Sequence, residues 1–143
     1  MAGYRGYIYS RPFLGERVPQ SVQNLVIRDY CRRVGLKYLL SAVEYCQPQT
    51  YLMLNAVLTE LPSLDGVVSY SLFQLPVAQT ARLSVYDRIL INGKSLHFAL
   101  EGLNISSRSD VERMEDIWKV RLVMPECLDV MDRFVNGRRV LLP

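Results

Sequence analysis

The chain has 143 residues, a formal net charge of +3, and a composition that is 50% hydrophobic and 22% charged. These values are typical of a single globular domain and exclude a disordered chain. Apolar runs such as Gly66–Tyr70 reach about five residues, whereas a membrane-spanning helix needs about 20. We therefore expect no membrane partner, and the first residues also lack the apolar segment of a signal peptide. Lysine and arginine are spread thinly along the chain, which does not favour nucleic-acid binding.

Three widely spaced cysteines, Cys31, Cys46 and Cys127, form an odd set without a CxxC pair. This usage fits a reducing compartment better than a disulfide framework. We therefore expect a cytoplasmic protein.

Short β-rich runs alternate with helical stretches through the first hundred residues. The expected elements in chain order are a strand at Tyr4–Ser10, a helix from Pro19-Gln20-Ser21 to Gly35, a strand at Leu36–Tyr45, a helix at Thr50–Leu61, a strand around Val67–Ser71, a helix at Val77–Leu90 and a strand at Ser95–Leu100. Such alternation predicts a three-layer α/β/α sandwich with a mainly parallel sheet. Because a central parallel strand is buried on both faces, Val67, Val68 and Tyr70 should be among the least exposed residues.

Residues 106–143 differ from the rest and are expected to form a helical extension of the same 1–143 domain. Ser109 and Glu112 have the spacing of a capping box, which predicts a helix to about Ile117. Lys119–Val123 fits either a short fifth strand or an extension. Pro125 should restart a helix that runs to about Phe134 and ends at Asn136-Gly137, and Arg138–Pro143 would be a terminal strand or tail.

Ligands of open parallel sheets bind at the carboxyl ends of the strands. The polar residues expected there are Ser10, Arg11, Arg17, Glu44, Ser71, Gln74 and Glu101, with His97 inside the fourth strand. We expect the first seven side chains to line one pocket.

Arg11 and Arg17 flank a glycine-containing loop, and arginine presents a planar fork of donors to phosphate or carboxylate. The alternative is two solvated arginines. Ser10 fits either a nucleophile or a loop cap. Arg11, Arg17, Ser71, Gln74 and Glu101 are the residues predicted to bind the substrate.

His97, the single histidine, or Glu44 would move a proton if there is a reaction. The alternative for His97, which stands between Leu96 and Phe98, is a hydrogen-bonded core residue. Glu44 and Glu101 would follow neighbouring strands and form a carboxylate pair, although the sequence does not determine their separation.

No GxGxxG, Walker loop, GxSxG elbow or metal-spaced His/Cys/Asp cluster occurs in the sequence. The sequence therefore predicts no nucleotide cofactor and no metal site.

The first 105 or so residues resemble the catalytic domain of serine recombinases of the resolvase/invertase family. The segments that carry this resemblance are Gly6–Ser10, Gln20–Gln23, Asp65–Leu72 and Leu96–Gly102. The resemblance implies a small parallel-sheet domain that self-associates, with Ser10 where that family keeps its nucleophile.

The family's catalytic arginines have no counterpart in this sequence. Phe73–Val77 stands where an Asp-Arg-Leu-x-Arg motif is expected. Ile8 and Tyr9 stand where the family has an arginine just before the serine, and Thr50-Tyr51 where it has an arginine before the second helix. Phosphoryl transfer depends on such cations for positioning and charge stabilisation. We therefore expect no recombinase activity, and DNA is not an expected partner.

The whole chain more closely resembles a small bacterial family of sporadic carbohydrate cluster proteins. The strings that carry this resemblance are GYRGYIYSRPFLGERVPQSVQN, YSLFQLP, LHFALEGL and DVERMEDIW. It implies a role in surface-carbohydrate biosynthesis, in which the pocket would bind or transform an anionic sugar derivative such as a sugar phosphate or nucleotide sugar. The alternative is a non-catalytic scaffold protein. A tail rich in apolar residues, including Val130, Met131 and Phe134, also predicts a homodimer.

Overall fold

The computed structural model describes residues 2–13, 17–47 and 50–137, with side chains described up to Val123. The expected terminal strand or tail at Arg138–Pro143 lies outside the described residues.

A five-stranded sheet forms the centre of the fold. Its strands are β1 (Tyr4–Tyr9), β2 (Tyr38–Glu44), β3 (Gly66–Ser69), β4 (Ser95–Phe98) and β5 (Leu103–Ile105), in the spatial order β2-β1-β3-β4-β5. The first four strands are parallel, and β5 is antiparallel to β4. The mostly parallel sheet that the sequence predicts is confirmed.

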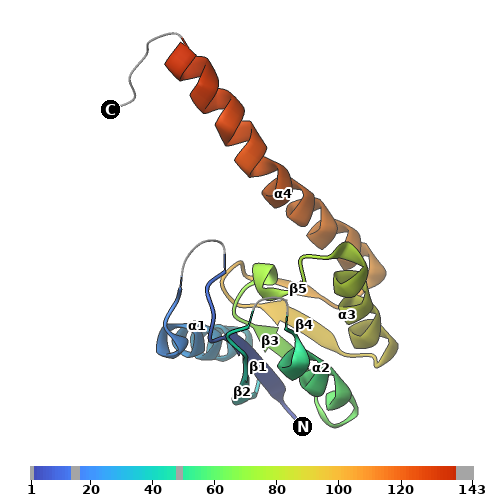
Figure 1. Cartoon of the computed structure of the whole chain (residues 1–143). Helices are drawn as coiled ribbons and strands as arrows, with labels where there is room; N and C mark the ends of the chain where they lie inside the picture. The colour runs from blue at the N-terminus through green and yellow to red at the C-terminus, as the bar shows by residue number, and fades with distance from the viewer. Residues whose placement is uncertain (1, 14–16, 48–49, 138–143) are drawn as a thin grey trace. The chain divides into compact units, whose positions relative to one another are not determined.

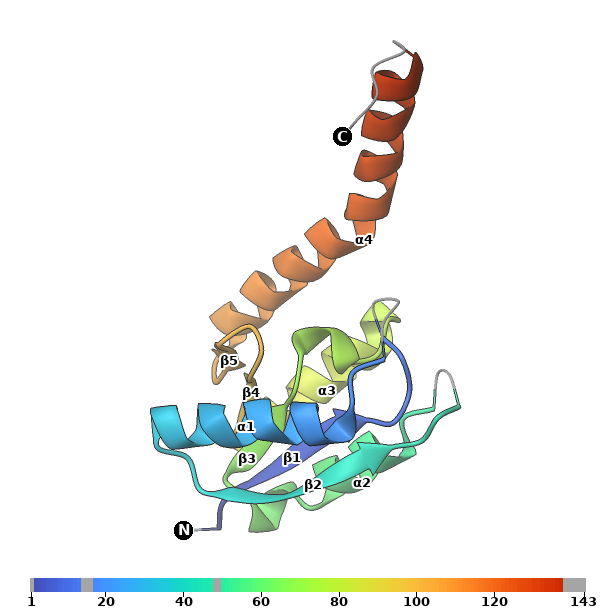
Figure 2. The same cartoon turned by 90° about the vertical axis from the view of Figure 1, so that its left-hand side faces the viewer.

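Helices cover both faces of the sheet. Figures 1 and 2 show α1 (Gln20–Val34) on one face and α2 (Leu52–Thr59) and α3 (Gln79–Ile91) on the other. This placement follows from the strand order, because right-handed crossovers to opposite sides of β1 put their helices on opposite faces.

The central strand β3 is buried along its whole length, as predicted, and Val67 and Val68 are fully inaccessible. On the α1 face, Val68 and Ile8 pack with Ile27 and Tyr30 of the helix in one apolar cluster. Because apolar burial is the main favourable term in folding, this cluster holds the end of β1 against α1.

The ends of α1 confirm the sequence prediction. Pro19 is the N-cap residue, and Gly35 ends the helix with φ 79°, donating its N–H to Cys31. Glycine adopts this left-handed conformation at little steric cost, and such a residue terminates many helices.

The C-terminal part differs from the prediction in three ways. Lys119–Val123 is not a strand, because α4 runs without a break from Arg108 to Gly137 and passes through Pro125. The fifth strand is β5, whose three residues are too few for a recognisable alternation. The cap of α4 also involves other residues than the expected Ser109 and Glu112. The Asp110 carboxylate accepts hydrogen bonds from the backbone N–H groups of Ser106 at 2.9 Å and Ser107 at 3.1 Å.

The chain divides into two compact units, Met1–Val111 with the sheet and Glu112–Pro143 with most of α4. The expectation of one domain over 1–143 stays a prediction. Among the described residues, no helix is both long and apolar enough to cross a membrane.

Candidate functional site

The strand order reverses between β1 and β3, which makes the carboxyl ends of these strands the position where open α/β sheets bind ligands. The polar residues that follow β1, β2 and β3 meet here in two hydrogen-bonded clusters.

The first cluster surrounds the carboxylate of Glu44, which is fully buried at the end of β2. The carboxylate accepts hydrogen bonds from the Tyr7 hydroxyl at 2.8 Å and from the backbone N–H groups of Met53 at 3.1 Å and Leu54 at 3.0 Å. A negative charge at this place stabilises the N-terminus of α2, whose first turn has no acidic residue of its own. Burial, followed by the neighbouring Tyr9 and Glu44, raises the pKa of the Tyr7 phenol, which therefore stays a donor to Glu44.

Arg11 belongs to the same cluster and is only 6% exposed. One of its guanidinium nitrogens donates to the carbonyls of Tyr45 at 3.2 Å, Gln47 at 2.5 Å and Thr50 at 2.8 Å. The guanidinium also lies over the rings of Tyr9, at 4.4 Å, and Tyr51, at 5.0 Å. Arg11 therefore ties the loop between β2 and α2 to the end of β1, which differs from both the phosphate-binding and the solvated alternatives.

Ser10 and Arg17 lie beside this cluster. The Ser10 hydroxyl donates to the Glu44 carbonyl at 2.5 Å, and Arg17 donates to the Ser10 carbonyl at 3.0 Å. Within the described residues, no histidine, carboxylate or amine is hydrogen-bonded to the Ser10 hydroxyl. Among the described residues, Ser10 thus has no hydrogen-bonded base of the kind that activates a serine nucleophile.

The second cluster contains Ser71, Gln74 and Glu101. The Glu101 carboxylate accepts from the Ser71 hydroxyl at 2.7 Å and from the Leu72 backbone N–H at 2.8 Å, which holds the short 3-10 turn Leu72–Gln74. The Gln74 carbonyl accepts from the Tyr9 hydroxyl, which joins the two clusters. Glu44 and Glu101 belong to different clusters, each with its own donors.

Gln23 links the second cluster to β1, and sequence reasoning missed it. Its side-chain oxygen accepts from the Tyr9 N–H and from the Gln74 amide, both at 2.9 Å. Its amide nitrogen donates to the carbonyls of Tyr9 at 2.9 Å and Val18 at 2.8 Å. The sequence does contain a signal that predicts its burial. Gln23 lies four residues before Ile27, on the side of α1 that is buried.

The predicted substrate-binding residues lie at one edge, and the polar atoms of Arg11, Ser71 and Gln74 bind the protein itself. Arg17 is exposed, which matches the solvated alternative for this residue. Ser71, Gln74, Gln23 and Glu44 are all fully buried. Because buried polar groups are costly unless they are hydrogen-bonded, these contacts explain why polar residues are tolerated at the carboxyl ends of β1 and β3.

His97 lies away from both clusters, which corrects its placement with the proton-transfer residues. Its two ring nitrogens pair with the Tyr30 hydroxyl at 2.7 Å and the Ser95 hydroxyl at 3.0 Å, the latter at the amino end of β4. Burial lowers the pKa of His97 to about 4, so the ring is neutral at pH 7. These contacts match the alternative of a hydrogen-bonded core histidine.

In the part of the chain that the structure describes, no three His, Cys, Asp or Glu side chains are grouped so as to hold a metal ion.

Two solved structures share this architecture. The structure matches the N-terminal catalytic domain of TP901-1 integrase with a TM-score of 0.62 and 16% identity, over 86% of this chain and 98% of that one. It also matches a resolvase family site-specific recombinase from Streptococcus pneumoniae with a TM-score of 0.59 and 11% identity, over 95% of this chain and 99% of that one. No protein-family model and no curated protein matches the sequence. The chain therefore has the fold of resolvase catalytic domains, and at these identities the likeness concerns the fold alone.

Replacing Glu44 with glutamine tests whether this carboxylate is a structural group. Glu44→Gln removes a charge that accepts four hydrogen bonds in a buried place, so the free energy of unfolding should fall by about 2–3 kcal/mol. Glu60→Gln is the matched control, because Glu60 forms an exposed pair with Arg5 and should change stability by less than about 1 kcal/mol. Urea denaturation measures both. Equal effects of the two substitutions would contradict the structural role.

The neutral state of His97 makes stability depend on pH. Between an unfolded pKa of about 6.5 and the folded value of about 4, the unfolded chain binds a proton that the folded chain does not. Stability is therefore highest above pH 6.5 and falls by about 3 kcal/mol as the pH is lowered to 4. Urea denaturation across this range should show a smaller pH dependence for His97→Gln than for the unsubstituted protein. Parallel curves would show that the pKa of His97 does not differ between the folded and the unfolded chain.

Proposed function

We propose that this protein is a non-catalytic, self-associating interaction protein that uses the fold of a resolvase catalytic domain. The observation that carries the proposal is the internal hydrogen bonding of the buried polar side chains at the carboxyl ends of β1 and β3. A ligand that used Gln23, Gln74 or Arg11 would have to displace the hydrogen bonds that they make with the chain.

Ser10 supports the absence of cleavage chemistry. Its hydroxyl donates to a backbone carbonyl, and Arg11 is bound to three carbonyls of the loop that follows β2. Arg17 contacts the Ser10 carbonyl and not its hydroxyl. Oriented cations supply most of the stabilisation in phosphoryl transfer. Among the described residues, neither a base nor a cation is hydrogen-bonded to the Ser10 hydroxyl, which makes it a poor nucleophile toward DNA.

The sequence of α4 supports self-association. The helix has 30 residues and is about 45 Å long at 1.5 Å per residue. Apolar residues recur at intervals of three and four, at Ile117, Val120, Met124, Cys127, Met131 and Phe134. This is the a/d pattern of a coiled coil, and a second copy of the chain supplies the same stripe by symmetry. Val120 is 59% exposed, so its position is open to a partner.

The surface-carbohydrate role implied by the sequence resemblance is kept within this proposal. The protein would take part as a partner of other proteins of that process, since Arg11 and Glu44 are committed to structural contacts.

Self-association through α4 is tested by placing a charge on its apolar stripe. Val120→Glu should shift the mass in light scattering from a multiple of the 16.4 kDa chain toward 16.4 kDa, because a buried unpaired carboxylate is strongly unfavourable. Leu122→Glu is the matched control, since Leu122 is also exposed but lies at the opposite, f position of the heptad. A monomer mass for the unsubstituted protein at tens of micromolar would defeat the proposal.

The absence of cleavage is tested with supercoiled DNA and with nicked suicide substrates. We expect no covalent protein–DNA product in denaturing gels, and Ser10→Ala should behave like the unsubstituted protein. A covalent adduct that disappears in Ser10→Ala would establish a nucleophilic serine and overturn the non-catalytic assignment.

A further inference from the structure

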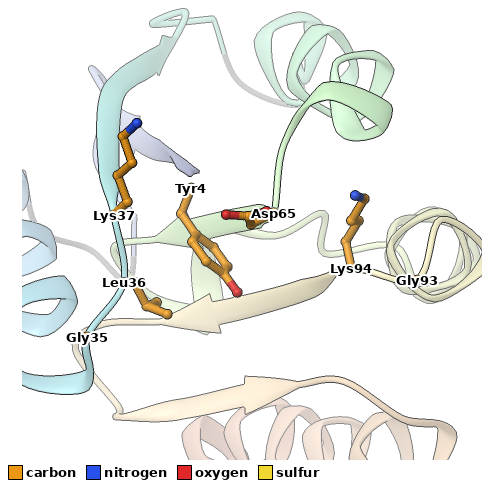
Figure 3. Close-up of a pocket in the computed structure, with 7 residues that line it drawn as sticks. All are labelled: Tyr4, Gly35, Leu36, Lys37, Asp65, Gly93 and Lys94. Carbon is orange, nitrogen blue, oxygen red and sulfur yellow. The ribbon is translucent and has the colours of Figure 1, made fainter. Parts of the chain in front are cut away.

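The amino ends of the parallel strands border a hollow, on the edge of the sheet opposite the clusters of Glu44 and Glu101. Its volume is about 400 Å³, and its lining includes Tyr4, Lys37, Asp65 and Lys94 (Figure 3). The volume lies in the range of small-molecule sites. No function discussed above uses it.

Four neighbouring strands each contribute one of these residues. Tyr4 opens β1, and the other three directly precede β2, β3 and β4. Neighbouring strands lie about 4.8 Å apart, so the backbones of Lys37 and Lys94 are about 14 Å apart across three strand spacings. Figure 3 shows the two lysines on either side of the hollow, with Tyr4 and Asp65 between them.

The backbone under the hollow is held in place. Gly3 donates to the Asp65 carboxylate at 2.8 Å and accepts from the Asp65 N–H at 2.7 Å, while Tyr4 donates its N–H to the Lys37 carbonyl at 2.8 Å. The Tyr4 hydroxyl pairs with Ser95 at 3.0 Å, and its ring meets the buried His97 edge-on. The lining therefore exists before any ligand binds, which reduces the entropy lost on binding.

The charges around the hollow are of two kinds. Within the described residues, neither Lys37 nor Lys94 forms an ion pair. The second oxygen of the Asp65 carboxylate has no hydrogen-bond donor in that same part of the chain. The chain has only three lysines among its 17 basic residues, and two of them stand here. An ammonium group binds phosphate as a compact point charge, whereas a carboxylate oxygen accepts from a hydroxyl group.

From this arrangement we infer that the hollow at the amino ends of β1–β4 binds a phosphate monoester whose organic part carries hydroxyl groups. Lys37 and Lys94 hold the phosphate, and the unoccupied Asp65 oxygen accepts a hydrogen bond from a hydroxyl. The inference does not depend on self-association through α4.

Chemical labelling of the three lysines tests the site with an internal control. The full chain is acetylated with a small amount of acetic anhydride in the presence of glucose 6-phosphate, ribose 5-phosphate or glycerol 3-phosphate, and acetylation of each lysine is quantified by mass spectrometry. We expect at least one of these esters to slow labelling of Lys37 and Lys94, by about ten-fold at ten times its dissociation constant. Lys119, which lies on α4 near Asp116, should label at an unchanged rate.

Substitutions separate specific binding from general attraction of anions. In titration calorimetry, Lys37→Gln and Lys94→Gln should each weaken binding of the protecting ester by about ten-fold. Lys119→Gln removes the same charge elsewhere and should leave affinity unchanged. None of the three should alter the mass in light scattering, so a failure of this site is distinguishable from a failure of self-association.

Three results would overturn the inference. Unchanged labelling with all three esters would show that the hollow is not a site. Equal protection by inorganic phosphate would remove the role of the hydroxyl groups. Equal protection of Lys119 would show that the anions bind the surface without specificity.

Discussion

The side chain of Gln23 completes the hydrogen bonding of Tyr9 where β1 leaves the sheet, and the carboxyl edge depends on this contact. The β3 ladder ends at Ser69, opposite Tyr7, so the N–H and C=O of Tyr9 have no strand partner on that side. The Gln23 amide supplies both partners at 2.9 Å and binds Gln74 at the same time. Since an unpaired buried backbone group costs about 1–3 kcal/mol, this bridge lets β1 continue past the end of β3.

The same topology can therefore carry different chemistry. The strand order places Ser10 at the switch point of the sheet, a position that many α/β proteins use for binding. Here the surrounding groups bind carbonyls, ring faces and helix N–H groups of the chain itself. Function follows from the site and not from the fold.

The two edges of the sheet differ because of what lies next to each strand end. At the carboxyl edge, the loops turn back and present carbonyls and N–H groups to Arg11 and Glu44. At the amino edge, helices α1 and α3 end at Gly35 and near Gly93, and short connections lead straight into β2 and β4. Such short connections leave little chain to cover Lys37 and Lys94, so the hollow at this edge stays open.

The sequence by itself determined the alternation of strands and helices, the ends of α1 at Pro19 and Gly35, the burial of β3 and the edge at which Ser10, Glu44 and Ser71 meet. These follow from local preferences and from the direction of parallel strands. Only the tertiary structure decided that Arg11 binds carbonyls, that Gln23 bridges Tyr9 and Gln74, and that His97 faces Tyr30. The bonding partners of a polar side chain depend on where distant backbone groups point, and residue spacing carries no information about those directions.

The continuous α4 has a related cause: Pro125 removes one N–H group from the helix, but both flanking segments favour helix, and their combined preference outweighs the local penalty.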